Sequence, residues 1–216
     1  MDISSYQIRR CENPECGLRF PLVDNNPNGD RCPICLGTTR LVLEGMLEGV
    51  PFSAERSRPR VPLEGLLDNI RSAWNVGSIF RTSDGIGLRR LHLCGITPTP
   101  EIESVVKTAL GAERFIPWTY SRDALQSAIS LRAAGYQLWA LEQDPRADPI
   151  ESISVLDRQD PAVLIVGNEI TGVDPELMEC CDRIIHLPMH GRKRSINVAV
   201  AFGIAAHHLS LKMAKN

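Results

Sequence analysis

Short apolar runs alternate with helical patterns over residues 63–216. Four runs rich in apolar residues and bounded by Gly, Pro or Asp predict strands, and they lie at 91–94, 137–141, 162–166 and 183–187. Helical patterns occur at 101–110, 121–135 and 195–213, the second with a Ser121 cap, Asp123 in its first turn and Gly135 at its end. Strand and helix in alternation predict an α/β fold with a mainly parallel sheet, whose ligands bind at the carboxyl ends of the strands.

The first 50 residues differ, because they hold four of the seven cysteines. The pattern C-x4-C, fifteen residues, C-x2-C matches a four-thiolate zinc ribbon formed by Cys11, Cys16, Cys32 and Cys35. Two disulfides are the alternative, disfavoured in a reducing compartment. Four thiolates leave no open coordination position, so the zinc would be structural. Cys94, Cys180 and Cys181 lack metal spacing and are interpreted as buried small hydrophobic residues.

We therefore expect a zinc-ribbon-like domain at 1–50, a Pro- and Arg-rich linker at 51–62 and a larger domain at 63–216. Arg56, Arg58 and Arg60 of the linker could follow a phosphate backbone or could simply be solvated. With 24 Lys and Arg against 26 Asp and Glu, any nucleic acid must be held by a local basic patch. No apolar run reaches the length of a membrane span and no signal peptide is visible, so we expect a cytoplasmic protein.

A first candidate cluster covers residues 66–87. Asn75 is predicted to cap a helix whose apolar side consists of Val76, Ile79, Phe80 and Ser83. Arg81 would project from the other side, between Gly77 and Gly85. Two glycines in a helix indicate that something approaches the backbone closely. An arginine that is only solvated is the alternative.

Two further clusters lie in the C-terminal part. Residues 162–181 run from a buried strand into Gly167, Asn168, Glu169 and Gly172, which is typical either of a ligand cradle or of an ordinary strand-to-helix turn. Residues 184–209 carry a basic trio, either a phosphate patch or a solvated loop, before Ser195 caps a helix of small residues. The trio is Arg192, Lys193 and Arg194. The histidines have no partner at metal spacing.

Taken in order, the clusters read N-x-G-x-x-x-R-T, G-N-E-x-x-G-V and P-M-x-G-x-x-x-S-[IL]-N-V-[AS]. This order resembles the SpoU/TrmH branch of the SPOUT RNA methyltransferases, as does the stretch KTALGAERFIPW at 107–118. The resemblance covers roughly residues 61–212 and leaves the cysteine-rich segment outside.

The resemblance implies a mainly parallel sheet with a C-terminal trefoil knot, a homodimer and S-adenosylmethionine bound in the knot. It implies methyl transfer to a ribose 2′-hydroxyl of tRNA or rRNA, with no DNA or membrane partner. The implied catalytic residues are Asn75, Arg81, Glu169, Ser195 and Asn197. The implied cofactor-binding residues are Leu141, Gly167, Asn168, Glu169, Ile185, Leu187, Pro188, Met189, Ser195, Ile196 and Asn197. RNA contacts are expected from Arg56, Arg58, Arg60, Arg81, Arg192, Lys193 and Arg194.

Some roles stay open at this point. Arg81 is either the general base or a clamp that holds phosphate and orients the hydroxyl, and a permanently protonated guanidinium favours the clamp. The ribbon either grips RNA or caps the dimer. The alternative functions are a non-catalytic RNA-binding or ribosome-assembly protein and a SPOUT enzyme that methylates a base nitrogen, but the S-I-N-V motif favours ribose.

Overall fold

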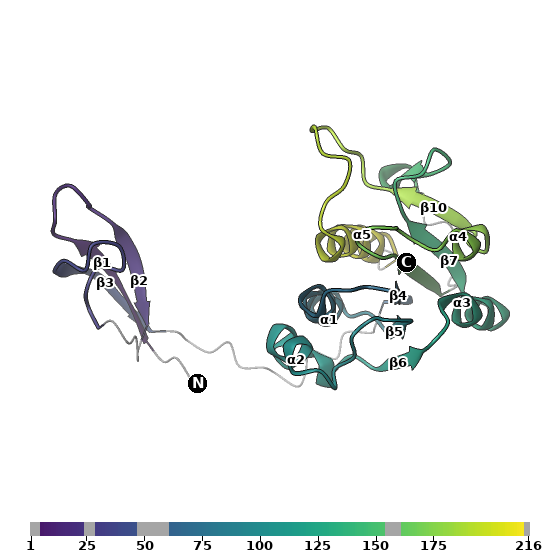
Figure 1. Ribbon diagram of the computed structural model, residues 1–216, viewed down its shortest axis with the longest axis horizontal. Coiled ribbons are helices and arrows are strands. Elements are labelled where there is room, and N and C mark those ends of the chain that lie inside the picture. Colours follow the sequence, from purple (N-terminus) through teal and green to yellow (C-terminus); the bar gives the residue numbers. More distant parts are fainter. Residues whose placement is uncertain (1–4, 24–28, 47–60, 154–160, 214–216) are drawn as a thin grey trace. The chain divides into compact units, whose positions relative to one another are not determined.

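A computed structural model describes residues 5–23, 29–46, 61–153 and 161–213. The chain divides into two compact units, Met1–Arg56 and Ser57–Asn216, which are treated separately below (Figure 1). The predicted linker lies outside the described residues except for its last two positions. Arg56, Arg58 and Arg60 therefore lie outside them as well.

The first unit is a three-stranded antiparallel sheet with two turns that carry the cysteines. Its strands are β1 (Ser5–Cys11), β2 (Arg19–Val23) and β3 (Thr39–Met46), in the order β2-β1-β3. Cys11 and Cys32 are the buried residues among those described in this unit. The described part of this unit therefore has little apolar core.

The second unit contains a seven-stranded sheet, in the order β6-β5-β4-β9-β7-β10-β8, whose neighbouring strands all pair in parallel. The strands are β4 (Leu63–Asp68), β5 (Leu91–Cys94), β6 (Trp118–Ser121), β7 (Gln137–Leu141), β8 (Asp148–Pro149), β9 (Ala162–Val166) and β10 (Arg183–His186). The helices are α1 (Ala73–Ile86), α2 (Glu103–Ala109), α3 (Ala124–Ala133), α4 (Pro175–Glu179) and α5 (Val198–Met213), with short 3-10 turns η1 (Ala112–Arg114) and η2 (Ile150–Ser152).

Helices cover both faces of this sheet, as expected for parallel strands. Helices α1, α2 and α5 lie on one face and α3 and α4 on the other (Figure 1). The larger core cluster, which includes Phe80 and Phe202, lies under the first group, and a smaller one with Leu66 and Leu138 lies under the second. Strands β4 and β9 are buried along their whole length. The predicted α/β fold with a parallel sheet is confirmed.

Most predicted strands match the structure, and three strands were missed. Strands β5, β7 and β9 have the predicted bounds, and β10 ends one residue early. The pattern missed β4, β6 and β8. In β4 the sequence LEGLLD does not suggest a buried strand, but Glu64 is buried because His92 Nε2 and the Tyr136 hydroxyl both bond its carboxylate, at 2.7 and 2.9 Å.

The predicted helix caps at Asn75, Ser121 and Ser195 are wrong. Ser72 caps α1 and its hydroxyl accepts from the Asn75 N–H. Ser121 ends β6, and the Asp123 carboxylate caps α3. Helix α5 begins at Val198, and the Asn197 side chain rather than Ser195 accepts from its first-turn N–H groups. The caps of α3 and α5 directly precede the first helical residue, whereas Ser121 and Ser195 lie two residues too early. Asn75 lies inside the first turn of α1, and the cap, Ser72, comes before that turn.

The two glycines that flank Arg81 have different environments. A Cβ at Gly77 would lie 2.6 Å from the Val105 carbonyl oxygen, so the close approach there is made by helix α2. A Cβ at Gly85 would meet nothing within 4 Å. The prediction that something approaches the helix backbone closely is therefore confirmed at Gly77, where the neighbour is another helix of the same chain, and wrong at Gly85.

Two further expectations concern chain threading and membranes. Strand order does not define how a chain is threaded, so the trefoil knot stays a prediction. Within the described residues, no helix combines the length and the apolar character needed to cross a bilayer.

Candidate functional site

A cavity of about 450 Å³ opens where three neighbouring strands of the second unit end. Its walls come from the ends of β7, β9 and β10 and from the start of α5. This is the edge where parallel sheets bind ligands, and the volume suits a small organic molecule. Glu142 and Glu169 line the cavity, whereas no Lys or Arg does so in the described part of the chain. The site therefore favours a neutral or cationic ligand over a phosphate.

The turn after β9 forms one wall and is closed by its own backbone. Asn168 and Gly172 exchange two hydrogen bonds of 2.9 and 3.0 Å, and the Asn168 side-chain amide donates to the Asn69 carbonyl at 2.7 Å. A Cβ at Gly167 would collide with the backbone of Gly172 and Val173. Glycine is therefore required at position 167 for this turn to fold back so tightly.

Glu169 fastens this turn to the start of helix α1. Its carboxylate accepts from the Arg71 and Ser72 N–H groups at 2.9 and 3.1 Å and from the Asn75 amide at 2.9 Å. Desolvation acts to raise the pKa of Glu169, but these hydrogen bonds outweigh it and lower the pKa below its ordinary 4.5. The carboxylate is thus an anchor and a weak base.

A chain of hydrogen bonds joins Glu169 to the start of helix α5 through Asn75. The Asn75 side-chain oxygen Oδ1 accepts from the Asn197 side-chain amide at 3.0 Å. Asn197 in turn accepts from the Ala199 and Val200 N–H groups at 2.9 and 3.3 Å. Glu169 and Asn197 lie 94 and 122 positions from Asn75 in the sequence, and these hydrogen bonds fix all three residues at one edge of the cavity.

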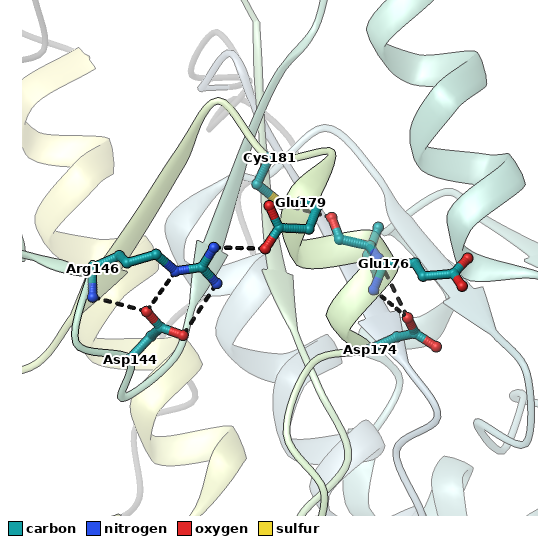
Figure 2. A network of polar contacts seen from close by, with 7 residues as sticks. Asp144, Arg146, Asp174, Glu176, Glu179 and Cys181 are labelled. Carbon is teal, nitrogen blue, oxygen red and sulfur yellow. Dashed lines mark hydrogen bonds and ion pairs between the residues drawn. The ribbon is translucent and has the colours of Figure 1, made fainter.

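The segment after β7 forms the third wall and is fixed from two sides. Gln143 donates to the Leu187 carbonyl at 2.8 Å, which ties this segment to the loop after β10. Figure 2 shows Arg146 between Asp144 and Glu179, with its guanidinium 2.9 and 2.6 Å from their carboxylates. Because Glu179 belongs to α4, this ion cluster holds the wall against a helix.

Most of the predicted cofactor residues lie together around the cavity. Those that line it are Leu141, Gly167, Asn168, Glu169, Leu187, Met189, Ser195, Ile196 and Asn197. Ile185 does not line it, because its side chain is fully buried in the core, and Pro188 does not line it either. Asn75 reaches the edge of the site through Glu169 and Asn197.

The predicted basic residues that the structure describes do not line the cavity. Arg81 is exposed on α1, six residues and therefore about 9 Å along the axis from Asn75. Arg192, Lys193 and Arg194 are exposed in the loop before α5. The structure therefore separates a cofactor-sized cavity from the basic side chains proposed to contact RNA.

Sequence reasoning missed several residues of the cavity wall. They are Glu142, Gln143, Val166, Ile170, His186, Val198 and Ala201. The one usable signal was position, because Glu142 and Gln143 directly follow the predicted strand 137–141. His186 has no partner at metal spacing in the sequence, and in the structure it lines the cavity.

The four N-terminal cysteines form a separate cluster in the first unit. Their sulfur atoms all lie within 4.8 Å of one another, with Cys11 and Cys35 at 3.4 Å and Cys16 and Cys32 at 3.7 Å. A tetrahedral zinc with Zn–S bonds of about 2.3 Å needs sulfur atoms about 3.8 Å apart. In both turns the residue after the second cysteine is left-handed, Gly17 at φ 57° and Leu36 at φ 57°. The cluster therefore has the geometry of two paired knuckles.

In a comparison with known protein families, residues 63–207 match the sequence model of the SpoU rRNA Methylase family. The chain is 32% identical to the 23S rRNA (guanosine-2'-O-)-methyltransferase RlmB of Pseudomonas aeruginosa over 74% of this chain and 62% of that protein. It is 31% identical to the 23S rRNA (guanosine(2553)-2'-O)-methyltransferase RlmP of Bacillus subtilis over 67% of this chain and 56% of the relative. The chain thus spans less than two thirds of the length of these curated relatives.

Solved structures agree with this fold. The A. aeolicus TrmH/SpoU tRNA modifying enzyme superposes with a TM-score of 0.63 at 25% identity, covering 71% of this chain and 76% of that one. The AdoMet-bound rRNA methyltransferase from Sinorhizobium meliloti gives 0.64 at 29% identity, covering 71% and 57%. The family match begins at residue 63, so it does not include the cysteine cluster.

Proposed function

The chain belongs to the SpoU rRNA methylase family, and from that premise we propose that it transfers a methyl group from S-adenosylmethionine to a ribose 2′-hydroxyl of tRNA or rRNA. The observation that carries the proposal is the hydrogen-bonded chain Glu169–Asn75–Asn197 at the edge of the cavity. It joins one residue from each of the three sequence motifs.

The cavity fits the cofactor in size and in charge. Its apolar members Leu141, Leu187 and Met189 suit a flat base, and the Gly167 turn offers backbone groups for polar edges. Two carboxylates without a lysine or arginine suit a cationic sulfonium and amine. Bound there, S-adenosylmethionine would supply an electrophilic methyl group, so the protein mainly has to position a hydroxyl and manage one proton.

The residues of the site differ in how well they could accept the proton of the ribose hydroxyl. Glu169 is a poor base, because three hydrogen bonds hold its carboxylate in the ionised form. Arg81 is exposed and outside the lining, which supports a contact with an RNA molecule lying across α1. We assign Arg81 the task of holding a phosphate and orienting the ribose, and Ser195 and Asn197 the task of positioning the reacting groups.

We also propose that the cysteine cluster holds a structural zinc ion. The sulfur distances match those required by tetrahedral zinc, and four thiolates complete its coordination. Within the part of the first unit that the structure describes, Cys11 and Cys32 are the buried residues, and this gives the ion a clear role, since such a small sheet needs a cross-link to stay folded.

A homodimer is the assembly that we propose. Helix α5 presents Val200 and Ile204 four residues apart, with 53 and 48% of their surface exposed, and Ile196, two residues before the helix, is 40% exposed. Trp74 on α1 is 71% exposed. An apolar strip on α5 and an exposed tryptophan suit the packing of a second copy of the chain.

Incubation with methyl-labelled S-adenosylmethionine and bulk RNA, followed by nuclease and alkali treatment, tests the function. Label in alkali-resistant dinucleotides supports ribose methylation, whereas label in base-methylated nucleosides or none at all contradicts it. Arg81→Ala is expected to lower transfer at least 100-fold while calorimetry finds cofactor binding unchanged. Arg81→Lys should restore part of the activity, since lysine keeps the charge and loses the fork.

A further inference from the structure

Three arginines lie side by side across the sheet of the first unit. Arg10 of β1 pairs with Arg19 of β2 on one side and with Arg40 of β3 on the other. Directly paired residues of neighbouring strands project from the same face, and strands are about 4.8 Å apart. Arg10, Arg19 and Arg40 therefore form an arginine row about 10 Å long.

This row costs the sheet stability. Like charges placed directly opposite one another repel, and all three side chains are exposed. None of them makes a hydrogen bond or an ion pair with a residue that the structure describes. Arg9 projects from the opposite face and shows the contrast, because it bonds Gln7, Thr39 and Asp30. The guanidinium groups of the arginine row repel one another in the free protein. An anion bound along the row would offset this repulsion and would explain why the three arginines lie together.

The rest of the same face is apolar and carries no carboxylate in the described strands. Glu44 pairs with Gln7 and so belongs to the opposite face. The Tyr6 ring lies over the backbone of β3, because a Cβ at Gly45 would be 2.7 Å from it. Together with the arginine row, the residues of this face are Tyr6, Ile8, Pro21, Val23, Leu43 and Gly45.

We propose that the arginine row binds the phosphate backbone of a single-stranded RNA segment whose bases lie against the apolar part of this face. The inference rests on the proposed function, which makes RNA the substrate. Guanidinium groups match phosphate in charge and shape. Tyr6 and its apolar neighbours offer a surface to unpaired bases, which a duplex would keep stacked inside. The first unit is then an RNA-binding module that acts outside the cofactor cavity.

The test measures binding of a fluorescein-labelled oligouridylate to the full, zinc-loaded chain by fluorescence anisotropy between about 50 and 200 mM salt. The triple variant Arg10→Gln, Arg19→Gln, Arg40→Gln is compared with the matched variant carrying three Lys substitutions. Each single-strand phosphate contact contributes about 0.7 to the slope of log affinity against log salt, so the Gln variant should lose about 2. The Lys variant should keep most of the slope.

Zinc content and thermal unfolding show that the variants are folded, and removal of the repulsion should leave the Gln variant at least as stable as the wild type. If the triple variant does not fold, Arg10→Gln alone should lower the slope by about 0.7. An unchanged slope overturns the proposal and would favour an acidic protein surface as the partner. Equal losses in the Gln and Lys variants overturn it too. Failure of the proposed function is seen separately, as a wild type that binds RNA through the row but transfers no methyl group.

Discussion

Glu169→Gln is the substitution that most directly tests how the cavity is held together. Glutamine keeps the shape of glutamate but replaces one acceptor oxygen with an NH2 donor. In the most favourable orientation its oxygen still accepts from the Ser72 N–H and the Asn75 amide, while its NH2 group faces the Arg71 N–H. One hydrogen bond is then lost and two donors point at each other.

The expected cost follows from these contacts. A hydrogen bond to a charged group contributes about 1.5–3 kcal/mol when it is buried. Glu169 is exposed, so solvent screening reduces this to roughly 1–2 kcal/mol. The turn that carries Glu169 is a wall of the cavity and must be in place when the cofactor binds. The dissociation constant for S-adenosylmethionine should therefore rise about 5- to 30-fold.

Isothermal titration calorimetry with S-adenosylmethionine measures this change, and Glu176→Gln is the matched control. Glu176 lies a few residues further on, and only its backbone N–H bonds Asp174, so its carboxylate can be neutralised without loss of a described contact (Figure 2). The control should bind like the wild type. If Glu169→Gln binds as tightly as Glu176→Gln, the hydrogen-bonded chain Glu169–Asn75–Asn197 does not hold the cofactor site together.

Three further predictions concern the turn, the zinc site and the buried carboxylate. Gly167→Ala should abolish cofactor binding in calorimetry, because the added methyl collides with backbone; retained affinity contradicts this. Cys35→Ser should lose bound zinc by emission spectroscopy and unfold the first unit, whereas Cys180→Ser should keep both; a full zinc content in Cys35→Ser refutes the assignment. Desolvation acts to raise the pKa of Glu64, but hydrogen bonding, first from His92, outweighs it and lowers the pKa below its ordinary value. The contribution of Glu64 to the free energy of unfolding is therefore present above pH 4.5 and lost as the pH falls through the pKa of the folded state. The difference in melting temperature between wild type and Glu64→Gln should thus shrink in acid, and a constant difference argues against it.

The buried strand that could be predicted is one in which all the residues are apolar. Ala162–Val166 is a continuous apolar run, and its length and composition suffice for a buried parallel strand. Strand β4 is equally buried, but Glu64 and Asp68 hide it from a hydrophobicity pattern. Their partners, His92 and the Asp174 N–H, lie 28 and 106 residues away. Pairing at that separation is a tertiary fact that local sequence does not contain.

The candidate site divides in a similar way. The glycine-rich turn and its position after a strand could be predicted from local rules, and the structure places that turn at the cavity. The hydrogen bonds that join Asn75, Glu169 and Asn197 could not be predicted, because no spacing rule relates these three residues. They were named through the resemblance to a family, and the geometry gives the physical reason. An asparagine can accept from one side chain and donate to another, so Asn75 bridges a carboxylate and an amide.

The arginine row could not be predicted from the sequence, because its members are far apart along the chain. The sequence drew attention to clustered arginines in the linker, because three of them lie within five residues. Arg10, Arg19 and Arg40 attract no notice along the chain, and they meet only because the strands pair in one register. A shift of one residue in either pairing would send one arginine to the other face.

The cavity walls are not equally fixed, and this bears on how a ligand would bind. The walls after β7 and β9 and the start of α5 are held by Arg146, Glu169 and Asn197. Residues 188–196, which supply Met189, make no hydrogen bond to a residue that the structure describes, although they complete the enclosure. Three walls are therefore preorganised by hydrogen bonds, which lowers the entropic cost of binding, while the fourth lacks such bonds beyond Leu187. Cofactor affinity should accordingly depend more on Glu169 and Asn197 than on any one side chain of that loop.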